Sequence, residues 1–165
     1  KTHREKLQEA KELSKLCKEN KVLFIVNDHV DIALMADADG VHVGQEDMPV
    51  EDIRRILGPN KIIGLSTHSI ADAKEALEKD IDYIGVGPIF PTTTKDREAV
   101  GLEYLEFVQN NVDLPYIAIG GIKESNLSEI IERGATRVAL VSEIVGAENI
   151  GEKIEKLKGQ LVISN

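Results

Sequence analysis

A short apolar run that ends in polar residues, Val22-Leu23-Phe24-Ile25-Val26-Asn27-Asp28, is the first indication of the fold. Such a run is typical of a parallel strand that is covered on both faces. The chain holds six runs of this kind, at 22–26, 41–43, 62–65, 83–86, 116–119 and 138–141. Amphipathic segments separate them. The alternation predicts an α/β fold with a parallel sheet, either open and doubly wound or closed as a barrel.

The segments between the runs carry helix-end signals. Thr2 with Glu5 predicts a capping box at the start of the first helix. The apolar face of that helix is predicted to hold Leu7, Ala10, Leu13, Leu16 and Cys17. Pro49 is expected as a first helical residue and Gly58 as the stop of the same helix. Ser69 is the expected N-cap of the next helix. Between residues 32 and 36 there is room only for a short helical turn.

Composition bounds the class of protein. The 165 residues suit a single domain over 1–165, and 42% hydrophobic residues exclude a disordered chain. Twenty basic against twenty-nine acidic residues give a net charge of -9, which argues against nucleic acid as the main ligand. No run reaches the roughly 18 apolar residues of a membrane span, and no leader is visible. With Cys17 alone, no intramolecular disulfide is expected, and we expect a cytoplasmic protein.

Polar or glycine-rich residues follow every predicted strand. They are residues 27–28, 44–47, 66–68, 87–88, 120–121 and 142. In both candidate architectures, ligands bind at the carboxyl ends of the strands. We therefore expect these residues to line one shared pocket.

Two acids in these positions, Asp28 and Asp47, follow neighbouring strands. Adjacent strands lie roughly 5 Å apart, so both carboxylates could face one Mg²⁺ ion, which favours one or two carboxylates plus phosphate oxygens. The alternative is that Asp28 caps the short helix that follows and that Asp47 is a solvated loop acid.

Three other segments suggest phosphate binding. The loop after the fourth run carries Thr92, Thr93, Thr94 and Lys95, whose hydroxyls and ammonium suit a phosphate. The alternative is an ordinary exposed polar loop. Gly121 and the Val141–Ser142 strand end resemble the last two strand ends of phosphate-binding barrels; the alternative is turn glycines and a serine cap. Ser66 is a donor to a second phosphate or a turn serine. His42, in mid-strand, is expected to be a hydrogen-bonded core residue.

The segments 25–28, 39–49, 63–68, 85–95 and 118–122 together resemble the thiamine-phosphate synthase family along essentially the whole chain. The resemblance implies a TIM (β/α)₈ barrel that joins 4-amino-5-hydroxymethyl-2-methylpyrimidine diphosphate to a thiazole phosphate, giving thiamine phosphate and pyrophosphate. It implies Mg²⁺ as cofactor, with Asp28 and Asp47 as its ligands. It places Asn27, Ser66 and Lys95 on the pyrimidine diphosphate, and Lys95 and Ser66 are the catalytic candidates. It places the thiazole phosphate on Thr92, Thr93, Thr94, Gly121, Val141 and Ser142.

The chain departs from the family pattern at two points. The family has two strands before the first one here, the second with a Gln-Leu-Arg-Glu-Lys-type motif that grips the diphosphate, and commonly has Arg where His29 stands. We expect six of the eight βα units. The chain is then a portion of a larger protein, or it is completed by another copy or a complementing segment, or it is a remnant.

Two alternative functions remain from the sequence. One is a thiazole tautomerase-like protein, although that branch typically has a histidine where Pro88 stands. The other is a non-catalytic phosphate-binding scaffold. We expect small-molecule substrates as partners, and we expect neither nucleic acid nor a membrane.

Overall fold

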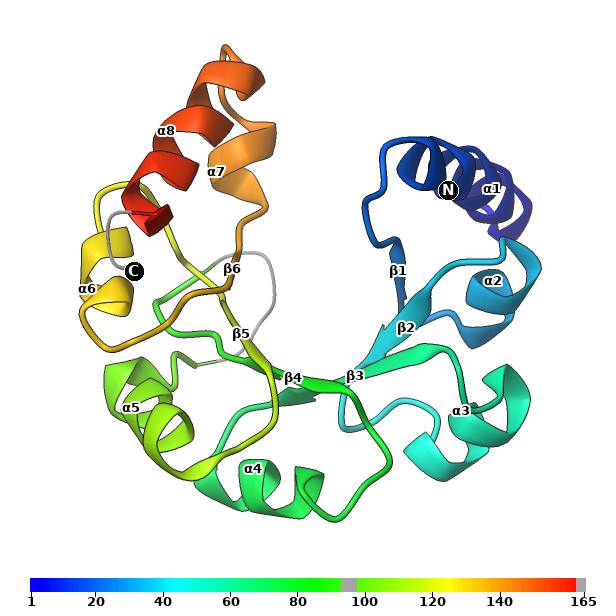
Figure 1. The fold of residues 1–165 in the computed structure, drawn as a ribbon, viewed down its shortest axis with the longest axis horizontal. Helices are drawn as coiled ribbons and strands as arrows, with labels where there is room; N and C mark the ends of the chain where they lie inside the picture. Colours follow the sequence, from blue (N-terminus) through cyan, green and yellow to red (C-terminus); the bar gives the residue numbers. More distant parts are fainter. Residues whose placement is uncertain (93–97, 163–165) are drawn as a thin grey trace. The chain divides into compact units, whose positions relative to one another are not determined.

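The computed structural model describes residues 1–92 and 98–162. Six strands alternate with helices along this part of the chain (Figure 1). The strands are β1 (Ile25–Asn27), β2 (Gly40–Val43), β3 (Ile62–Thr67), β4 (Tyr83–Val86), β5 (Tyr116–Ile119) and β6 (Val138–Ala139). The helices are α1 (His3–Glu19), α2 (Val30–Met35), α3 (Val50–Leu57), α4 (Ile70–Ala76), α5 (Gly101–Asn111), α6 (Leu127–Ile131), α7 (Ser142–Val145) and α8 (Ile150–Val162).

The strand order is the order of the chain, β1-β2-β3-β4-β5-β6. The pairs β1–β2, β2–β3, β4–β5 and β5–β6 are parallel. A doubly wound sheet reverses its strand order at a switch point, and this order contains no reversal. Consecutive parallel strands with a helix after each are the arrangement of a (β/α)₈ barrel. The prediction of six barrel-type βα units is therefore confirmed.

The chain divides into two compact units, which are described separately. Unit 1 comprises Lys1–Ser66 and Glu78–Tyr83; unit 2 comprises Thr67–Leu77 and the chain from Ile84 onward. The core of unit 1 includes Val41, Val43, Ile53 and Ile63, and that of unit 2 includes Ile84, Val86, Leu105, Leu127 and Ile130, all with almost no exposed surface. Strand residues dominate the set of unit 1, as expected for parallel strands covered on two faces, whereas in unit 2 two strand residues pack with three from α5 and α6. A single domain over residues 1–165 stays a prediction.

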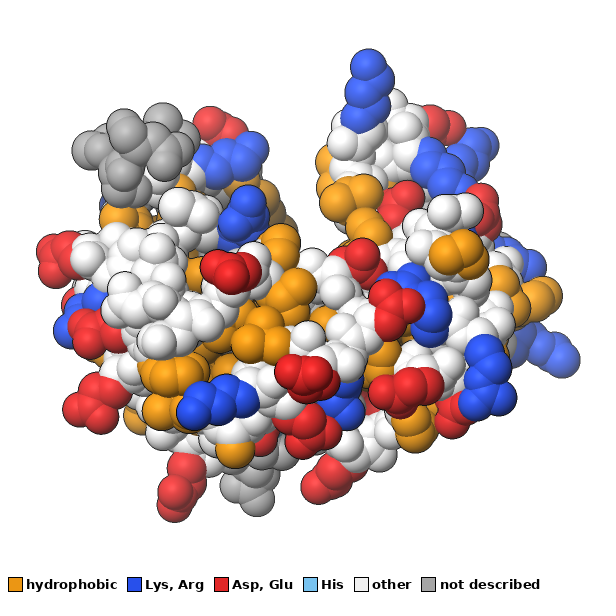
Figure 2. All heavy atoms as spheres, turned by 60° about the horizontal axis from the view of Figure 1, so that its bottom comes forward, with side chains coloured by type: hydrophobic (Ala, Val, Ile, Leu, Met, Phe, Trp, Pro, Cys, Tyr) orange, Lys and Arg blue, Asp and Glu red, His pale blue; other side chains and the backbone are white. Residues whose placement is uncertain are grey.

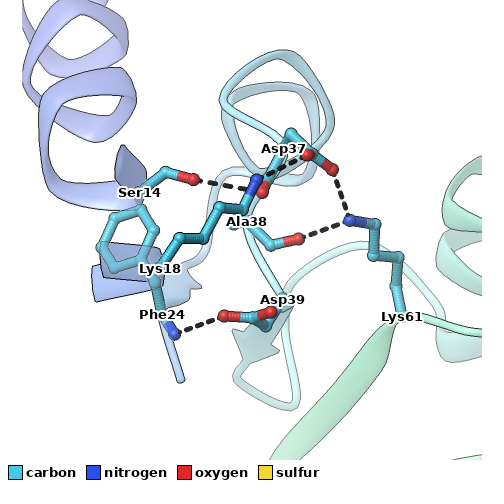
Figure 3. A network of polar contacts seen from close by, with 7 residues as sticks. All are labelled: Ser14, Lys18, Phe24, Asp37, Ala38, Asp39 and Lys61. Carbon is cyan, nitrogen blue, oxygen red and sulfur yellow. Dashed lines mark hydrogen bonds and ion pairs between the residues drawn. The ribbon is translucent and has the colours of Figure 1, made fainter. Parts of the chain in front are cut away.

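Helix α1 is joined to the rest of unit 1 by polar contacts around Asp37 (Figure 3). The Asp37 carboxylate accepts hydrogen bonds from Lys18 at 2.5 Å and from Lys61 at 2.7 Å. Ser14, buried on α1, donates to the Asp37 carbonyl at 3.1 Å. The two lysines hold the pKa of Asp37 at about 2, below its ordinary value of 3.8. This network links α1, the turn after α2 and the residue before β3.

Most predicted helix ends are confirmed, with one correction to a helix end and two to strand ends. The Thr2–Glu5 capping box and the Ser69 N-cap are present. Pro49 is the N-cap of α3 rather than its first residue. Strand β1 begins at Ile25, because the Val22 N–H bonds back to the Cys17 carbonyl and so completes the end of α1. The last run was also predicted too long, since β6 ends at Ala139.

The predicted apolar face of α1 was partly wrong. Ala10 and Ser14 are the buried residues of this helix, whereas Leu13 and Leu16 are 46% and 55% exposed. The small Ala10 and Ser14 allow close packing on α2, and the Ser14 hydroxyl finds a backbone partner there.

The outer surface is mixed in charge. Figure 2 shows acidic and basic side chains interspersed on one face, with apolar side chains between them. Within the described residues, no helix is both long and apolar enough to cross a membrane.

Candidate functional site

The predicted site residues of unit 1 lie at the carboxyl ends of its three successive strands. Asn27 is the last residue of β1, and Asp28 follows it; Asp47 lies in the loop after β2, and Ser66 is near the end of β3. Asn27, Asp28 and Asp47 are exposed and Ser66 is half-buried. We call these four residues the unit 1 strand-end cluster. The parallel pairing of β1 with β2 and of β2 with β3 places their carboxyl ends on one edge, as the sequence predicted.

Asp28 extends the β1 ladder by one residue. Its N–H donates to the His42 carbonyl on β2 at 2.8 Å, and its φ of +65° turns the chain out of the strand. Aspartate is among the few non-glycine residues that tolerate this region. The N-cap of α2 is His29, whose side chain makes no capping hydrogen bond within the described chain. The alternative that Asp28 caps α2 is therefore wrong.

Asp47 is held by its own loop. Its Oδ2 accepts the Gly44 N–H at 2.7 Å, which fixes the orientation of the carboxylate. Among the residues that the structure describes, no group of three or more His, Cys, Asp or Glu side chains could hold a metal ion alone. A pair of carboxylates at neighbouring strand ends fits a Mg²⁺ ion that takes its other ligands from phosphate and water. The donor set thus fits a magnesium ion shared with a phosphorylated ligand.

Ser66 is connected to a second layer of side chains. Its Oγ lies 2.8 Å from His42 Nε2, and its carbonyl accepts Gln45 Nε2 at 2.6 Å. His42 Nδ1 lies 3.0 Å from the Tyr83 hydroxyl. Burial raises the pKa of Tyr83 to about 12. The expectation that His42 is hydrogen-bonded is confirmed, with a predicted site residue and a tyrosine as partners, but the residue is half-buried and not part of the core.

In unit 2, the turn after β5 packs tightly on the segment after β4. Ile89 N–H donates to the Ile119 carbonyl at 2.9 Å, and Phe90 N–H donates to the Gly120 carbonyl at 3.0 Å. Gly121 has φ +64°, and a Cβ there would lie 2.6 Å from the carbonyl oxygens of Phe90 and Pro91. Only glycine fits this combination of conformation and close approach.

Of the remaining residues that were predicted to bind the phosphate, the structure describes three. Thr92 is half-buried just after this tight segment. Thr93, Thr94 and Lys95 lie outside the described residues. Val141 and Ser142 are both exposed, with Ser142 the first residue of α7 and Val141 its N-cap. Because β5 pairs with β6 through Ala118–Val138 and Ile119–Ala139, the Gly121 turn and the Val141–Ser142 segment follow neighbouring strand ends.

An ionic network fixes α7 beside this region. Glu143 Oε1 accepts the Glu124 N–H at 3.3 Å and Lys153 Nζ at 3.1 Å, while Lys153 also reaches Glu124 Oε2 at 3.0 Å. The hydrogen bond from Lys153 lowers the pKa of Glu143, and the two carboxylates raise the pKa of Lys153. The residue after Ser142 is thus anchored to α8 and to the β5–α6 loop.

A surface pocket of about 480 Å³ lies elsewhere in unit 2. Its lining includes His68, Ser69, Glu98 and Tyr104; of the residues expected to line the shared pocket it contains His68, and it contains none of those assigned to substrate or metal. His68 Nδ1 is 2.5 Å from the Gly87 carbonyl, so the pocket borders the end of β4.

The sequence did not indicate Tyr83 and Gly64 as neighbours of the predicted site, whereas Gln45 lies in the segment 44–47 that was expected there. The signal that could have found Tyr83 and Gly64 is strand register. His42 pairs with Gly64, and Ser66 lies two residues further along β3 on the same face. A glycine opposite a histidine leaves room for a large side chain from the neighbouring chain segment, and Tyr83 fills that room.

Comparison with known proteins gives consistent results over nearly the whole chain. A family model described as thiamine monophosphate synthase matches residues 1–144. A thiamine-phosphate synthase of Pelotomaculum thermopropionicum is 55% identical over 157 residues, which are 94% of this chain and 72% of that protein. One of Lawsonia intracellularis is 49% identical over 155 residues, 93% of this chain and 71% of that protein. A solved structure of thiamine phosphate pyrophosphorylase from Pyrococcus furiosus is similar with a TM-score of 0.92 and 40% identity, covering 99% of this chain and 79% of the other.

Proposed function

We propose, from the premise that this chain belongs to the thiamine monophosphate synthase family, that unit 1 binds the diphosphate of one substrate and unit 2 binds the phosphate of the other. The function is that of a transferase in thiamine biosynthesis. It couples 4-amino-5-hydroxymethyl-2-methylpyrimidine diphosphate to 4-methyl-5-(2-phosphoethyl)thiazole and releases thiamine phosphate and pyrophosphate. The observation that carries the division of roles is the pair Asp28 and Asp47 at the ends of paired strands, with Ser66 at the end of the next.

In this proposal Asp28 and Asp47 hold Mg²⁺. A bound Mg²⁺ neutralises the diphosphate and so makes pyrophosphate a better leaving group. The Gly44 N–H keeps the Asp47 carboxylate in one orientation, and the φ of +65° at Asp28 turns that residue out of the β1 ladder. The Asp47 carboxylate is thus preorganised and needs little rearrangement when a cation arrives.

The other groups of this chain bind and orient the reactants. Asn27 and Ser66 offer polar side chains to the diphosphate, and Lys95, outside the described residues, is proposed to stabilise the departing charge. The C–O bond to the pyrimidine methylene breaks with its electron pair on pyrophosphate, and the thiazole nitrogen forms the new C–N bond. The electron-rich aminopyrimidine stabilises the cationic methylene between these steps. No protein nucleophile is needed, so catalysis consists of positioning and charge stabilisation.

The thiazole phosphate is proposed to bind in unit 2. Gly121 lets the Phe90 and Pro91 carbonyls approach the turn after β5, and the backbone N–H groups of this turn are proposed to donate to the phosphate. Thr92, Ser142 and the backbone at Val141 supply further donors, together with Thr93 and Thr94 outside the described residues. The anchoring of Glu143 to Lys153 supports this assignment, because it fixes the segment that carries Ser142.

Small molecules are therefore the proposed partners. A cytoplasmic location and association with a second copy or a complementing segment belong to the same proposal. The exposure of Leu13, Leu16, Val22 and Leu23 in unit 1 supports such an association. Sedimentation velocity on the natural protein checks the oligomeric state.

The binding test uses pyrophosphate with and without Mg²⁺ on the natural gene product that contains this chain. A ligand at about 100 times its Kd stabilises the folded state by about 2.7 kcal/mol. We expect pyrophosphate to raise Tm only when Mg²⁺ is present, and Asp28→Ala to remove the rise. Equal stabilisation without Mg²⁺ would favour a phosphate-binding scaffold instead, and no stabilisation by either would contradict the site.

A further inference from the structure

His42 lies between a tyrosine and a serine in unit 1, on three successive strands. Its Nδ1 is 3.0 Å from the Tyr83 hydroxyl and its Nε2 is 2.8 Å from Ser66 Oγ. The His42 and Tyr83 rings lie 5.4 Å apart between centroids, at 31° to each other. Both nitrogens of the imidazole therefore have side-chain partners, and the three groups form a continuous chain that ends at Ser66.

The backbone is adapted to this arrangement at Gly64. A Cβ at this position would lie 2.1 Å from Tyr83 Cζ and 2.5 Å from His42 Nδ1. Any side chain at residue 64 would thus displace the tyrosine or the histidine. The close approach shows that the contact between the two rings is built into the packing of β2, β3 and the first residue of β4.

Two arrangements of protons fit the distances. In the first, the Tyr83 O–H donates to Nδ1 and Nε2–H donates to Ser66 Oγ, which leaves the Ser66 proton for another acceptor. In the second, Ser66 donates to Nε2 and Nδ1–H donates to the tyrosine oxygen. A neutral imidazole has one donor and one acceptor nitrogen, so the two cannot coexist.

The first arrangement suits an anion, and the second does not. Burial raises the pKa of Tyr83 to about 12, so its hydroxyl stays protonated near neutral pH. The Tyr83 hydroxyl lies against His42 Nδ1. Only in the first arrangement can Nδ1 accept the hydroxyl proton, so only there does that proton form a hydrogen bond with the ring. A diphosphate accepts hydrogen bonds and cannot donate them when ionised. Ser66 binds it well only if its own proton is not already committed to His42.

We propose that Tyr83 holds His42 as the Nε2–H tautomer, and that His42 thereby directs the Ser66 hydroxyl proton to the diphosphate. Tyr83 and His42 are thus positioning residues. This inference rests on the proposed function. Tyr83 and His42 touch neither substrate in this account; they act through Ser66.

The test combines nitrogen-15 NMR of the histidine rings with steady-state kinetics on the natural protein. The His42 signals are assigned by their loss in His42→Gln. The tautomer is measured in the ligand-free protein, under conditions where the ring is neutral. Tyr83→Phe removes the donor and keeps the ring against Gly64. Tyr116→Phe is the matched control, since Tyr116 is also half-buried and its hydroxyl bonds Gln109 in unit 2.

We expect the Nε2–H tautomer in the wild type and a mixture of tautomers in Tyr83→Phe. We also expect Tyr83→Phe to raise KM for the pyrimidine diphosphate roughly three- to tenfold, the effect of one hydrogen bond, with KM for the thiazole phosphate unchanged. Tyr116→Phe should change neither constant.

An Nδ1–H tautomer in the wild type overturns the inference whatever the kinetics. So does a Tyr83→Phe variant with wild-type tautomer and KM while the wild type turns over normally. A wild type that does not bind the pyrimidine diphosphate overturns the proposed function, and with it this inference; the two failures are therefore distinct.

Discussion

Gly121 combines a left-handed backbone with two carbonyl oxygens close to where a side chain would begin. Its φ is +64°, and the oxygens of Phe90 and Pro91 would lie 2.6 Å from a Cβ at this residue. The residue thereby couples the turn after β5 to the segment after β4. A substitution tests both the packing and the proposed phosphate site.

We predict that Gly121→Ala destabilises the protein. The left-handed conformation alone costs a non-glycine residue about 1–2 kcal/mol, and the contact with the two oxygens adds to it. Chemical denaturation should show a lower midpoint, and KM for the thiazole phosphate should rise. Gly159→Ala is the control, because Gly159 is exposed on α8 with nothing within 4 Å of a Cβ. That change should stabilise by up to about 1 kcal/mol. Equal midpoints for both variants would contradict the packing described here.

The two acids of the unit 1 strand-end cluster give a second prediction. Asp28→Asn and Asp47→Asn each keep the size of the side chain and remove its charge. Loss of electrostatic stabilisation at a leaving group costs on the order of 10²–10³ in kcat, and we expect a loss of that size in each variant. Asp52→Asn is the control, since Asp52 is a carboxylate of α3 paired with Arg55. If both cluster variants keep wild-type kcat and Mg²⁺ dependence, the metal assignment is wrong.

From the sequence, individual site residues could be proposed, but their hydrogen-bond partners could not. Asp28, Asp47 and Ser66 could be proposed because each lies in a polar segment that follows an apolar run. The contact of Ser66 with His42, and of His42 with Tyr83, could not be predicted, because it depends on the register His42–Gly64 between two strands. A shift of one residue in register would have turned these side chains to opposite faces.

At the scale of elements, helix α1 shows what patterns of apolar residues leave undecided. The Thr2–Glu5 capping box was predicted, since it needs only local spacing. The buried face was predicted only in part, because the packing of Ala10 and Ser14 on α2 depends on the tertiary structure. The start of β1 was missed for a similar reason: the backbone of Val22 bonds to the end of α1 rather than to β2.

The Asp37 network in Figure 3 predicts a pH dependence of unit 1. Lys18 and Lys61 lower the pKa of Asp37 from 3.8 to about 2 in the folded state. A carboxyl group with a depressed folded-state pKa stabilises the protein fully above its unfolded value. That contribution is lost as the pH falls from about 4 toward about 2. We therefore expect Asp37→Asn to lower Tm at neutral pH and to weaken its fall in acid.

The measurement is thermal unfolding from pH 7 down to pH 2. Asp113→Asn is the control, because it removes the same charge from an exposed loop residue. An acid limb of Asp37→Asn as steep as that of the wild type would show that the contacts of Lys18 and Lys61 do not stabilise the fold.

At the scale of the whole molecule, the alternation of runs predicted parallel strands but left open sheet and barrel as alternatives. The strand order decides between them, because it follows the chain without a reversal. Order is a tertiary property that apolar runs do not specify. The recurrence of polar residues after every strand predicts that ligands bind at the carboxyl ends of the strands, and this stays a prediction.

In the proposed function, the residues assigned in each unit bind a ligand of the same reaction. The net charge of -9 makes the protein surface as a whole unfavourable for phosphorylated ligands. Anion binding must therefore come from local hydrogen-bond donors and a bound cation. In unit 1 we assign it to Asn27 and Ser66 beside a Mg²⁺ ion. In unit 2 we assign it to the Gly121 turn and Ser142.

The central test of the proposed function is product formation by the natural gene product that contains this chain. The protein is supplied with the pyrimidine diphosphate, the thiazole phosphate and Mg²⁺, and thiamine phosphate and pyrophosphate are both quantified. We predict equal amounts of the two products, and none when Mg²⁺ is chelated or either substrate is omitted. Substrates that remain unconverted, with folded protein and saturating Mg²⁺, would contradict the account.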